Sequence, residues 1–422
     1  MQSPRILVIL MAAMAFGPGV MAEDWPQFRG PTGQGVSTEV HLPILWSAAS
    51  NVLWKVGIPG DGWSSPIVWD DHVFVTTTTD DGTTCRVLGL DCATGRVLWD
   101  KEVFKQTPGR KEARNSFAAP TPATDGKRVY AVFNDGSFAA VDFNGALAWT
   151  HREFKYYSQH GLGTSPILWE DLLIMARDGS SQGEDKSLGW QTPWDQSFLL
   201  ALERDTGKLR WKGMRGLSRI GHGTPCIWTS PDGRSQVVSG AGDVVQGFDA
   251  KTGERVWTSF NQGEGVVPSV VVGDGLVFTA CGYGGRESIK AFRLEGRGDL
   301  RETNLAWEQR QGMPKVPSLL YVKPYLYSIT DNGMAVCLKG DTGAVVWQER
   351  LGGTFSASPV YADGRIYFLS DTGETTVVAA GPQFGVAARN PLQERCQASM
   401  AISRGRFFIR TEKNLYCIAS TR

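Results

Sequence analysis

The chain has 422 residues, with 43 Lys and Arg against 43 Asp and Glu, and its formal net charge is +0. This balance excludes a general electrostatic attraction to nucleic acid or to an anionic membrane surface. The 50 Gly, the 15 Trp and the low share of charged residues, 20%, are typical of a protein with many tight turns and much aromatic packing.

Residues 1–22 have the pattern of a secretory signal peptide. Arg5 precedes an apolar run over residues 6–16, a Gly-Pro pair ends the run, and Ala22 places a small residue before the expected cleavage site. The run is too short to span a bilayer comfortably, and no Cys follows the cleavage site to carry a lipid. We therefore expect a periplasmic or secreted bacterial protein that is not a lipoprotein and has no transmembrane segment after cleavage.

Residues 23–50 contain the segment WPQFRGP and are rich in Gly and Pro, without hydrophobic periodicity. We expect them to form an extended lead-in that lies against the fold.

A twelve-residue phrase then recurs along the chain. QGFDAKTGERVW, residues 246–257, is a clear copy, LGLDCATGRVLW at residues 88–99 is another, and four more follow the same pattern, one shortened and one interrupted. An apolar run enters a turn of Asp, Thr and Gly and a second apolar run leaves it, which predicts a β-hairpin. The indole ring of the closing Trp is too large to be buried within one hairpin. We expect these residues to be structural and to pack between neighbouring units: Trp54, Trp99, Trp149, Trp211, Trp257, Trp307 and Trp347.

A second recurrence sets the number of units. Each unit opens with a small residue and usually Pro before a short apolar strand, as in SSPIVW from residue 64 and TSPILW from residue 164, and eight such openings occur. A further strand and the phrase complete each unit, which gives four short antiparallel strands in about fifty residues. The seventh unit lacks both the turn phrase and the Trp. A single distorted unit in place of the seventh and eighth would lower the number to seven, and we favour eight.

The two ends of the repeat region complement each other. Residues 51–58 resemble the second half of the phrase, and residues 414–420 resemble its first half. If the N-terminal strand completes the last sheet, a ring forms and the free sheet edges of an open array disappear. The sequence therefore predicts an all-β fold, an eight-bladed β-propeller over residues 51–422, rather than a linear solenoid.

The Thr-Gly-x-x-x-Trp copies resemble the PQQ-type propeller repeat, whose family includes quinoprotein alcohol dehydrogenases and the non-catalytic assembly lipoprotein BamB. The WPQFRGP segment resembles the lead-in of secreted bacterial PQQ-like propellers. In the dehydrogenases, the resemblance implies PQQ on the propeller axis with calcium, an Asp base and often a disulfide between adjacent Cys. This sequence has no adjacent Cys pair, no CxxCH haem site and no matching carboxylate and Asn cluster. We therefore expect no cofactor, with PQQ and calcium as the alternative.

In a propeller, the loops that lead into the innermost strands gather around the axis at one face. Most of the prominent side chains on these loops are basic, which favours an anionic ligand if they converge. The alternative is that they are solvated residues that point several ways. Two His alone do not make a metal site. The candidate binding residues are Trp63, Arg114, His160, Arg219, His222, Glu264, Lys315 and Arg395.

The longest insertion, residues 177–196, lies between the second and third strands of the third unit. It brings Trp190, Trp194 and Asp195 to the same face as the basic loops. Long loops in compact repeats are often functional, so the insertion is either a lid or docking tip, or a tolerated insertion on the rim.

Together these features predict a monomeric, non-catalytic scaffold that binds envelope or secreted proteins or peptides, as BamB-like proteins do. The alternatives are a PQQ-dependent alcohol or sugar dehydrogenase, and a small-anion or glycan binder that uses the basic loops.

Overall fold

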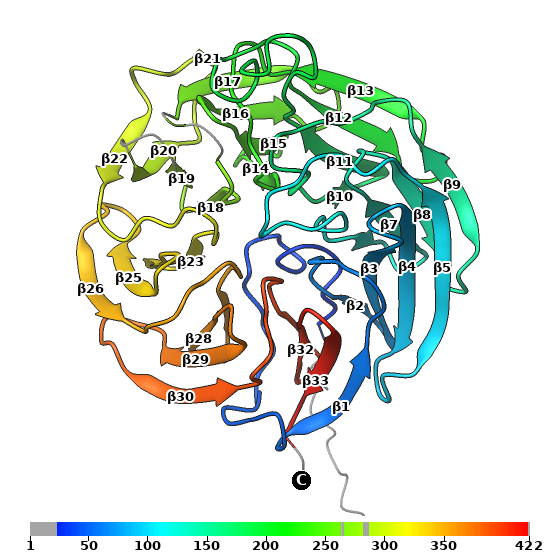
Figure 1. The fold of residues 1–422 in the computed structure, drawn as a ribbon. Coiled ribbons are helices and arrows are strands. Elements are labelled where there is room, and N and C mark those ends of the chain that lie inside the picture. Colours follow the sequence, from blue (N-terminus) through cyan, green and yellow to red (C-terminus); the bar gives the residue numbers. More distant parts are fainter. Residues whose placement is uncertain (1–22, 262, 264–265, 282–286, 421–422) are drawn as a thin grey trace, which may run out of the picture.

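The computed structural model describes residues 23–420 except 262, 264–265 and 282–286. The described residues form β-strands and no helix, so they contain no helix that is long and apolar enough to cross a membrane. The strands make eight sheets arranged around a central axis (Figure 1). This confirms the predicted eight-bladed β-propeller and decides against seven blades.

In blades 1 to 7 the four main strands run antiparallel and in chain order from the axis to the rim, and in blade 8 the N-terminal strand takes the outermost place. Blade 1 contains β2 (Ile67–Trp69), β3 (His72–Thr79), β4 (Thr84–Asp91) and β5 (Val97–Lys105); blade 2 contains β6 (Ala123–Thr124), β7 (Arg128–Val132), β8 (Phe138–Asp142) and β9 (Leu147–His151); blade 3 contains β10 (Ile167–Trp169), β11 (Leu172–Arg177), β12 (Phe198–Glu203) and β13 (Leu209–Met214); blade 4 contains β14 (Cys226–Thr229), β15 (Ser235–Gly240), β16 (Val244–Asp249) and β17 (Arg255–Phe260).

The second half of the ring follows the same order. Blade 5 contains β18 (Val271–Gly273), β19 (Leu276–Cys281), β20 (Ser288–Arg293) and β22 (Leu305–Gln309); blade 6 contains β23 (Leu320–Val322), β24 (Tyr325–Ile329), β25 (Met334–Lys339) and β26 (Val345–Arg350); blade 7 contains β27 (Val360–Ala362), β28 (Arg365–Leu369), β29 (Glu374–Ala379) and β30 (Val386–Pro391); blade 8 contains β31 (Ala401–Ser403), β32 (Arg406–Arg410) and β33 (Asn414–Ile418). A short strand, β21 (Gly298–Asp299), pairs parallel with the rim strand β17.

The N-terminal strand β1 (Val52–Gly57) closes the ring as the fourth strand of blade 8. It pairs antiparallel with β33, with Trp54 opposite Cys417 and Gly57 opposite Asn414. Figure 1 shows this blue strand beside the red end of the chain. The predicted closure is confirmed, and β1 gives blade 8 the same four strands as the other blades.

The recurring phrase forms the hairpin between the third and fourth strands. In blade 4 the Asp249 carboxylate accepts hydrogen bonds from the N–H groups of Lys251 and Thr252 and from the Thr252 hydroxyl. Gly253 follows with a φ of 72°, in the left-handed region that favours glycine. Asp, Thr and Gly therefore recur because each satisfies a separate requirement of the same turn.

The closing Trp residues join each blade to the next. The Trp211 indole N–H donates to the Ala250 carbonyl in the turn of blade 4, at 3.1 Å. A Cβ on Gly253 would lie 2.4 Å from the Trp211 ring, so the turn glycine is also required by the neighbouring indole. Five further indoles donate to the turn of the following blade in the same way: Trp54, Trp99, Trp149, Trp307 and Trp347. Trp257 instead donates to Gln236 of its own blade, at 2.8 Å, and is 1% exposed.

Blade 7 obtains its missing Trp from the lead-in. Ala388 stands opposite Val377, at the register position that Trp347 occupies opposite Cys337 in blade 6. Trp46 fills the space: it is 3% exposed, and its ring centroid lies 6.4 Å from Tyr367 of blade 7 and 5.2 Å from Phe407 of blade 8. The absence of a Trp in blade 7 is evident from the repeat, but its replacement by Trp46 is not, because Trp46 lies outside the repeat.

A ring of hydroxyl groups surrounds the axis. In each blade a buried Ser or Thr lies two residues before the innermost strand, and from blade 1 to blade 7 its N–H donates to the hydroxyl of the equivalent residue in the next blade. Seven consecutive bonds of this kind are 2.9 to 3.0 Å long and join Ser65, Thr121, Ser165, Thr224, Ser269, Ser318, Ser358 and Ser399 in that order. We call these residues the hydroxyl belt.

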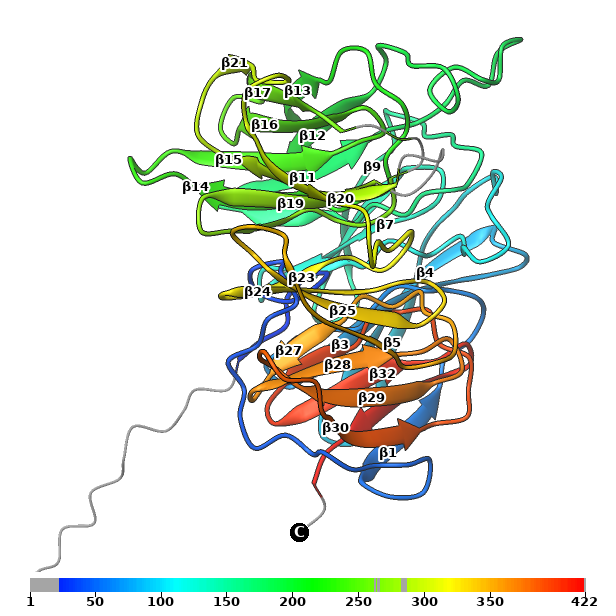
Figure 2. The ribbon, with the colours of Figure 1, turned by 90° about the vertical axis from the view of Figure 1, so that its left-hand side faces the viewer.

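The lead-in crosses one end of the axis. Trp25 and Val68 exchange backbone hydrogen bonds, the Arg29 guanidinium donates to the Leu319 carbonyl at 2.6 Å, and the Tyr361 N–H donates to the Gly35 carbonyl at 2.8 Å. Figure 2 shows this blue segment on the left-hand side of the ring. Because Trp25 and Arg29 are 0% and 1% exposed, the lead-in closes this end of the axis.

We predict that Trp46→Ala lowers the free energy of unfolding by about 3 to 5 kcal/mol, because it leaves a large cavity between blades 7 and 8. Guanidinium unfolding measures the change. Trp347→Ala should have an effect of the same size, and the neighbouring Leu45→Ala, at a position that is 64% exposed, should have little effect. An unchanged stability of Trp46→Ala would show that the lead-in does not support this interface.

We predict that Ser318→Ala costs about 1 to 3 kcal/mol, because the buried N–H of Ser269 loses its acceptor. Ser318→Thr keeps the hydroxyl and should retain most of the stability, since Thr occupies the same position in blades 2 and 4. Equal stability of the two variants in guanidinium unfolding would contradict the role of the hydroxyl belt.

Candidate functional site

The main candidate site is a pocket on the propeller axis, at the face opposite the lead-in. Its cavity volume is about 480 Å³, within the usual range for ligand pockets. Every blade contributes the residue four positions before its innermost strand, as Trp63 precedes Ile67. These residues are Trp63, Ala119, Gly163, His222, Val267, Val316, Ser356 and Gln397.

The structure brings some of the expected site residues to this pocket and leaves others outside. Arg114, His160 and Trp190 line it together with Trp63 and His222. Arg219 and Lys315 do not line it, and Arg395 lies in an adjoining groove. Glu264 is outside the described residues.

Eight lining residues were not predicted from the sequence: Glu112 and Asn115, on the loop of Arg114, and six of the equivalent positions, one per blade. A signal exists for these six, because each of the eight equivalent positions stands two residues before the Ser or Thr of the hydroxyl belt. Counting back from this hydroxyl residue in each of the eight openings identifies Ala119, Gly163, Val267, Val316, Ser356 and Gln397.

Aromatic rings form one wall of the axial pocket. The His160 ring lies edge-on to Trp190, with centroids 5.5 Å apart, and edge-on to His222, at 5.8 Å. Trp63 is 9% exposed, and the Arg395 guanidinium lies over its ring at 5.3 Å. The wall thus combines indole faces with imidazole groups.

His222 is neutral at ordinary pH. Burial, together with the neighbouring His160, lowers the pKa of His222 to about 3. Its Nε2 atom is buried and has no hydrogen-bond partner among the described residues, and the same holds for Ser356 Oγ and Gln397 Oε1. The walls therefore contain hydrogen-bonding capacity that the folded chain does not use.

The basic side chains near the axis are paired with carboxylates, which neutralises much of the positive charge that the sequence places there. The ion pairs are Arg219 with Asp243 at 2.6 Å, Lys315 with Glu287 at 3.2 Å, Arg395 with Glu412 at 3.0 Å and Arg114 with Asp331 at 3.7 Å. Within the described residues, no group of three or more His, Cys, Asp or Glu is placed to hold a metal ion.

The two Trp residues of the insertion, Trp190 and Trp194, lie in different surroundings. Trp190 reaches the axial pocket. Trp194 donates to the Ser197 hydroxyl at 3.0 Å and packs against Gly189, where a Cβ would lie 2.6 Å from its ring. Asp195 is exposed and accepts a hydrogen bond from Gln196. In Figure 2 the insertion, in green, projects on the side of the ring away from the lead-in.

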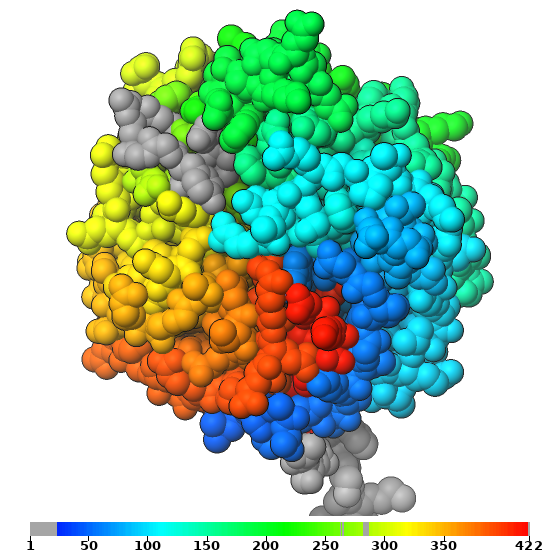
Figure 3. Space-filling model, viewed as in Figure 1, coloured from blue at the N-terminus to red at the C-terminus, as the bar shows by residue number. Residues whose placement is uncertain are grey.

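A polar groove adjoins the axial pocket over blades 7 and 8. It has a volume of about 600 Å³ and shares Arg114 and Gln397 with the pocket. On this face the cyan loop that contains Arg114 meets the orange-red segment near Arg395 at the centre (Figure 3). The groove is lined by Arg114, Thr354, Asp371, Thr372, Gln393, Glu394, Arg395 and Gln397.

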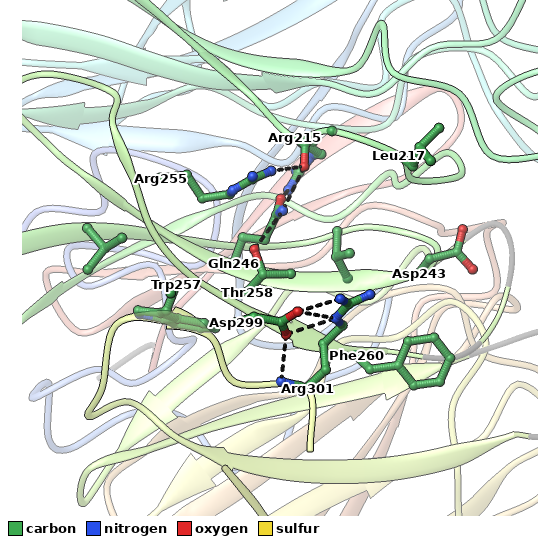
Figure 4. A pocket seen from close by; sticks show the side chains of 14 residues that line it. Arg215, Leu217, Asp243, Gln246, Arg255, Trp257, Thr258, Phe260, Asp299 and Arg301 are labelled. Carbon is green, nitrogen blue, oxygen red and sulfur yellow. Dashed lines mark hydrogen bonds and ion pairs between the residues drawn. The ribbon is translucent and has the colours of Figure 1, made fainter. Parts of the chain in front are cut away.

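A further pocket of about 480 Å³ lies on the rim of blade 4 (Figure 4). Its charged groups are committed to the fold: Arg301 pairs with Asp299, and Arg255 donates to the Arg215 carbonyl. Arg215 is in turn fully buried in an ion pair with Asp178. This pocket follows from the altered packing of blade 4 and offers few groups to a ligand.

Glu394 joins the groove to the closing strand of the ring. Its carboxylate accepts hydrogen bonds from Lys55 on β1 at 2.6 Å and from Thr411 and Tyr416 at 2.6 and 2.5 Å. Burial alone would raise the pKa of Glu394, but these bonds and a further one from Asn414 outweigh it and lower the pKa to about 2.

We predict that Glu394→Gln destabilises the protein at pH 7 and that its deficit disappears in acid. The pKa of Glu394 is lower in the folded chain, so its contribution is present above about pH 4.5 and is lost as the pH falls toward 2. Unfolding at pH 7, 4 and 2.5 measures this. Glu374→Gln, in a partly exposed ion pair with Arg389, is the control and should have a small effect. A deficit that is constant with pH would contradict the assignment.

Solved structures with the same fold include proteins of different function. BamB from Moraxella catarrhalis is 14% identical, with a TM-score of 0.60 and coverage of 88% of this chain and 98% of that chain. A europium-containing methanol dehydrogenase is 10% identical, with a TM-score of 0.65 and coverage of 94% and 98%. The computationally designed Ika8 protein is 12% identical, with a TM-score of 0.60 and coverage of 92% and 99%. At these identities the likeness concerns the fold alone.

The sequence itself matches one family over most of its length. No curated protein matches the chain. The family model described as outer membrane protein assembly factor BamB matches residues 36–152, 194–315 and 300–415, which confirms the resemblance drawn from the repeats. Because the match extends over more than half of the chain, this protein belongs to the family described as outer membrane protein assembly factor BamB.

Proposed function

We propose that this protein is a non-catalytic, periplasmic or secreted propeller scaffold that holds a ligand in its axial pocket. The observation that carries the proposal is the convergence of eight equivalent positions, one per blade, on a pocket with indole and imidazole walls. A concave site with aromatic walls and a few polar groups is the usual form of a ligand site. The family description supports a location and partners in the cell envelope.

The residues of the pocket do not fit a calcium-bound quinone. Calcium takes six to eight oxygen ligands, mainly carboxylates and carbonyls. Glu112 is the single carboxylate among the described lining residues. The Asn115 side chain is already committed, since it donates to the His160 carbonyl and accepts from the Ser116 N–H. The pocket thus lacks the oxygen set that would hold the metal and the cofactor together.

The pocket also lacks an activated nucleophile in its described part. Ser356 Oγ and His222 Nε2 both belong to lining residues, and neither has a hydrogen-bond partner there. A serine nucleophile needs a base within hydrogen-bond reach. Binding without chemistry is therefore the role that this arrangement supports best.

We predict that small molecules bind wild-type protein and that Ala119→Trp, which fills the axial pocket, weakens binding at least about tenfold. Calorimetry with citrate, the tripeptide Ala-Trp-Ala and maltotriose tests an anion, a peptide and a neutral sugar. Equal thermal stability of the variant shows that it folds. The proposal fails if none of the three binds, or if the variant binds as tightly as wild type. Dye-linked oxidation of methanol or glucose after incubation with PQQ and Ca²⁺ would also contradict it.

A further inference from the structure

We infer that the axial pocket and the polar groove together bind a neutral oligosaccharide, whose terminal ring lies in the pocket and whose chain continues along the groove. This inference rests on the proposed binding function and names its ligand class.

The axial pocket has the chemistry of a site for a sugar ring. Trp190 is partly exposed in the wall and offers an indole face, whose partial negative charge attracts the weakly positive C–H groups on the face of a pyranose. Glu112 and Arg114 are exposed at the pocket margin, where a carboxylate and a guanidinium fork pair well with neighbouring hydroxyls. The same wall therefore binds both the apolar face and the polar edge of one ring.

Unused acceptors favour a ligand that carries hydrogen-bond donors. Gln397 Oε1 in the pocket and Asp371 Oδ1 in the groove have no donor among the described residues. Sugar hydroxyls supply donors to such acceptors, whereas a carboxylate or phosphate ligand supplies none.

The charge of the combined site disfavours an anionic ligand. Its lining contains three carboxylates, Glu112, Asp371 and Glu394, against two arginines, Arg114 and Arg395. Both arginines are already paired with carboxylates outside the lining, and His222 is neutral. The site therefore does not concentrate anions in the way that a positively charged cleft does.

The groove favours a sugar chain over a peptide. Its eight lining residues are all polar or charged, while peptide recognition relies on an apolar groove or an open sheet edge. Part of the inner edge is already occupied, because the lead-in backbone bonds to Val68 of β2, Thr124 of β6 and Tyr361 of β27. The shared residues Arg114 and Gln397 make pocket and groove one continuous surface.

The test is calorimetry with maltotriose, cellotriose and triacetylchitotriose, and with the corresponding monosaccharides. At least one trisaccharide should bind, and more tightly than its monosaccharide. Trp190→Ala should weaken both by about 2- to 10-fold, because it removes a stacking face. Asp371→Ala should weaken the trisaccharide alone. Trp194→Phe, in the same insertion and outside the pocket, is the control and should bind as wild type does.

The outcomes separate this inference from the proposed function. If citrate or Ala-Trp-Ala binds in a manner blocked by Ala119→Trp and no trisaccharide binds, the scaffold proposal stands and the oligosaccharide inference is wrong. If a trisaccharide binds and Ala119→Trp or Trp190→Ala has no effect, the assignment to the axial pocket is wrong. Equal affinity for trisaccharide and monosaccharide would remove the groove from the site.

Discussion

A closed ring of eight sheets turns one edge of each innermost strand toward the axis, and the buried backbone groups on these edges need partners. Two devices satisfy this constraint. The hydroxyl belt engages one level with side-chain oxygens of the neighbouring blade, as Ser269 does with Ser318, and the lead-in engages the other level with its own backbone. The belt also holds the eight residues that stand two positions before its own residues in a circle around the axis. The axial pocket exists because the repeat geometry brings these eight positions together, whichever side chain each of them carries.

In the outer part of the ring, the closing Trp residues make the contacts between neighbouring blades. Two blades depart from this pattern, and in each a segment outside the repeat supplies the missing contact. Trp211 donates to a turn carbonyl of the next blade and requires the glycine on which it packs. Where blade 7 has Ala388, Trp46 arrives from a segment more than three hundred residues away in the sequence and packs on Tyr367. Blade 4 keeps Trp257 but covers it with β21 instead of a neighbouring turn. Each repair uses chain outside the repeat.

The pocket is built from the positions that the repeat leaves variable. Its eight equivalent positions carry Trp, Ala, Gly, His, Val, Val, Ser and Gln, whereas the belt below them carries Ser or Thr in every blade. The propeller fold is shared with BamB and with a methanol dehydrogenase, so the fold alone does not specify chemistry. The chemistry of this pocket lies instead in its aromatic wall, its paired arginines and its unused acceptors.

The sequence by itself determined the propeller fold, the strand order, the closure by residues 51–58 and the family, and it favoured eight blades over seven, because these features depend on short-range patterns repeated many times. It also placed Trp63, Arg114, His160 and His222 on the loops near the axis. Only the tertiary structure decided the number of blades, that Arg219 is held by Asp243, and that Trp46 replaces a missing Trp. The physical reason is that these contacts join segments whose proximity arises from ring closure, and no local spacing encodes that distance.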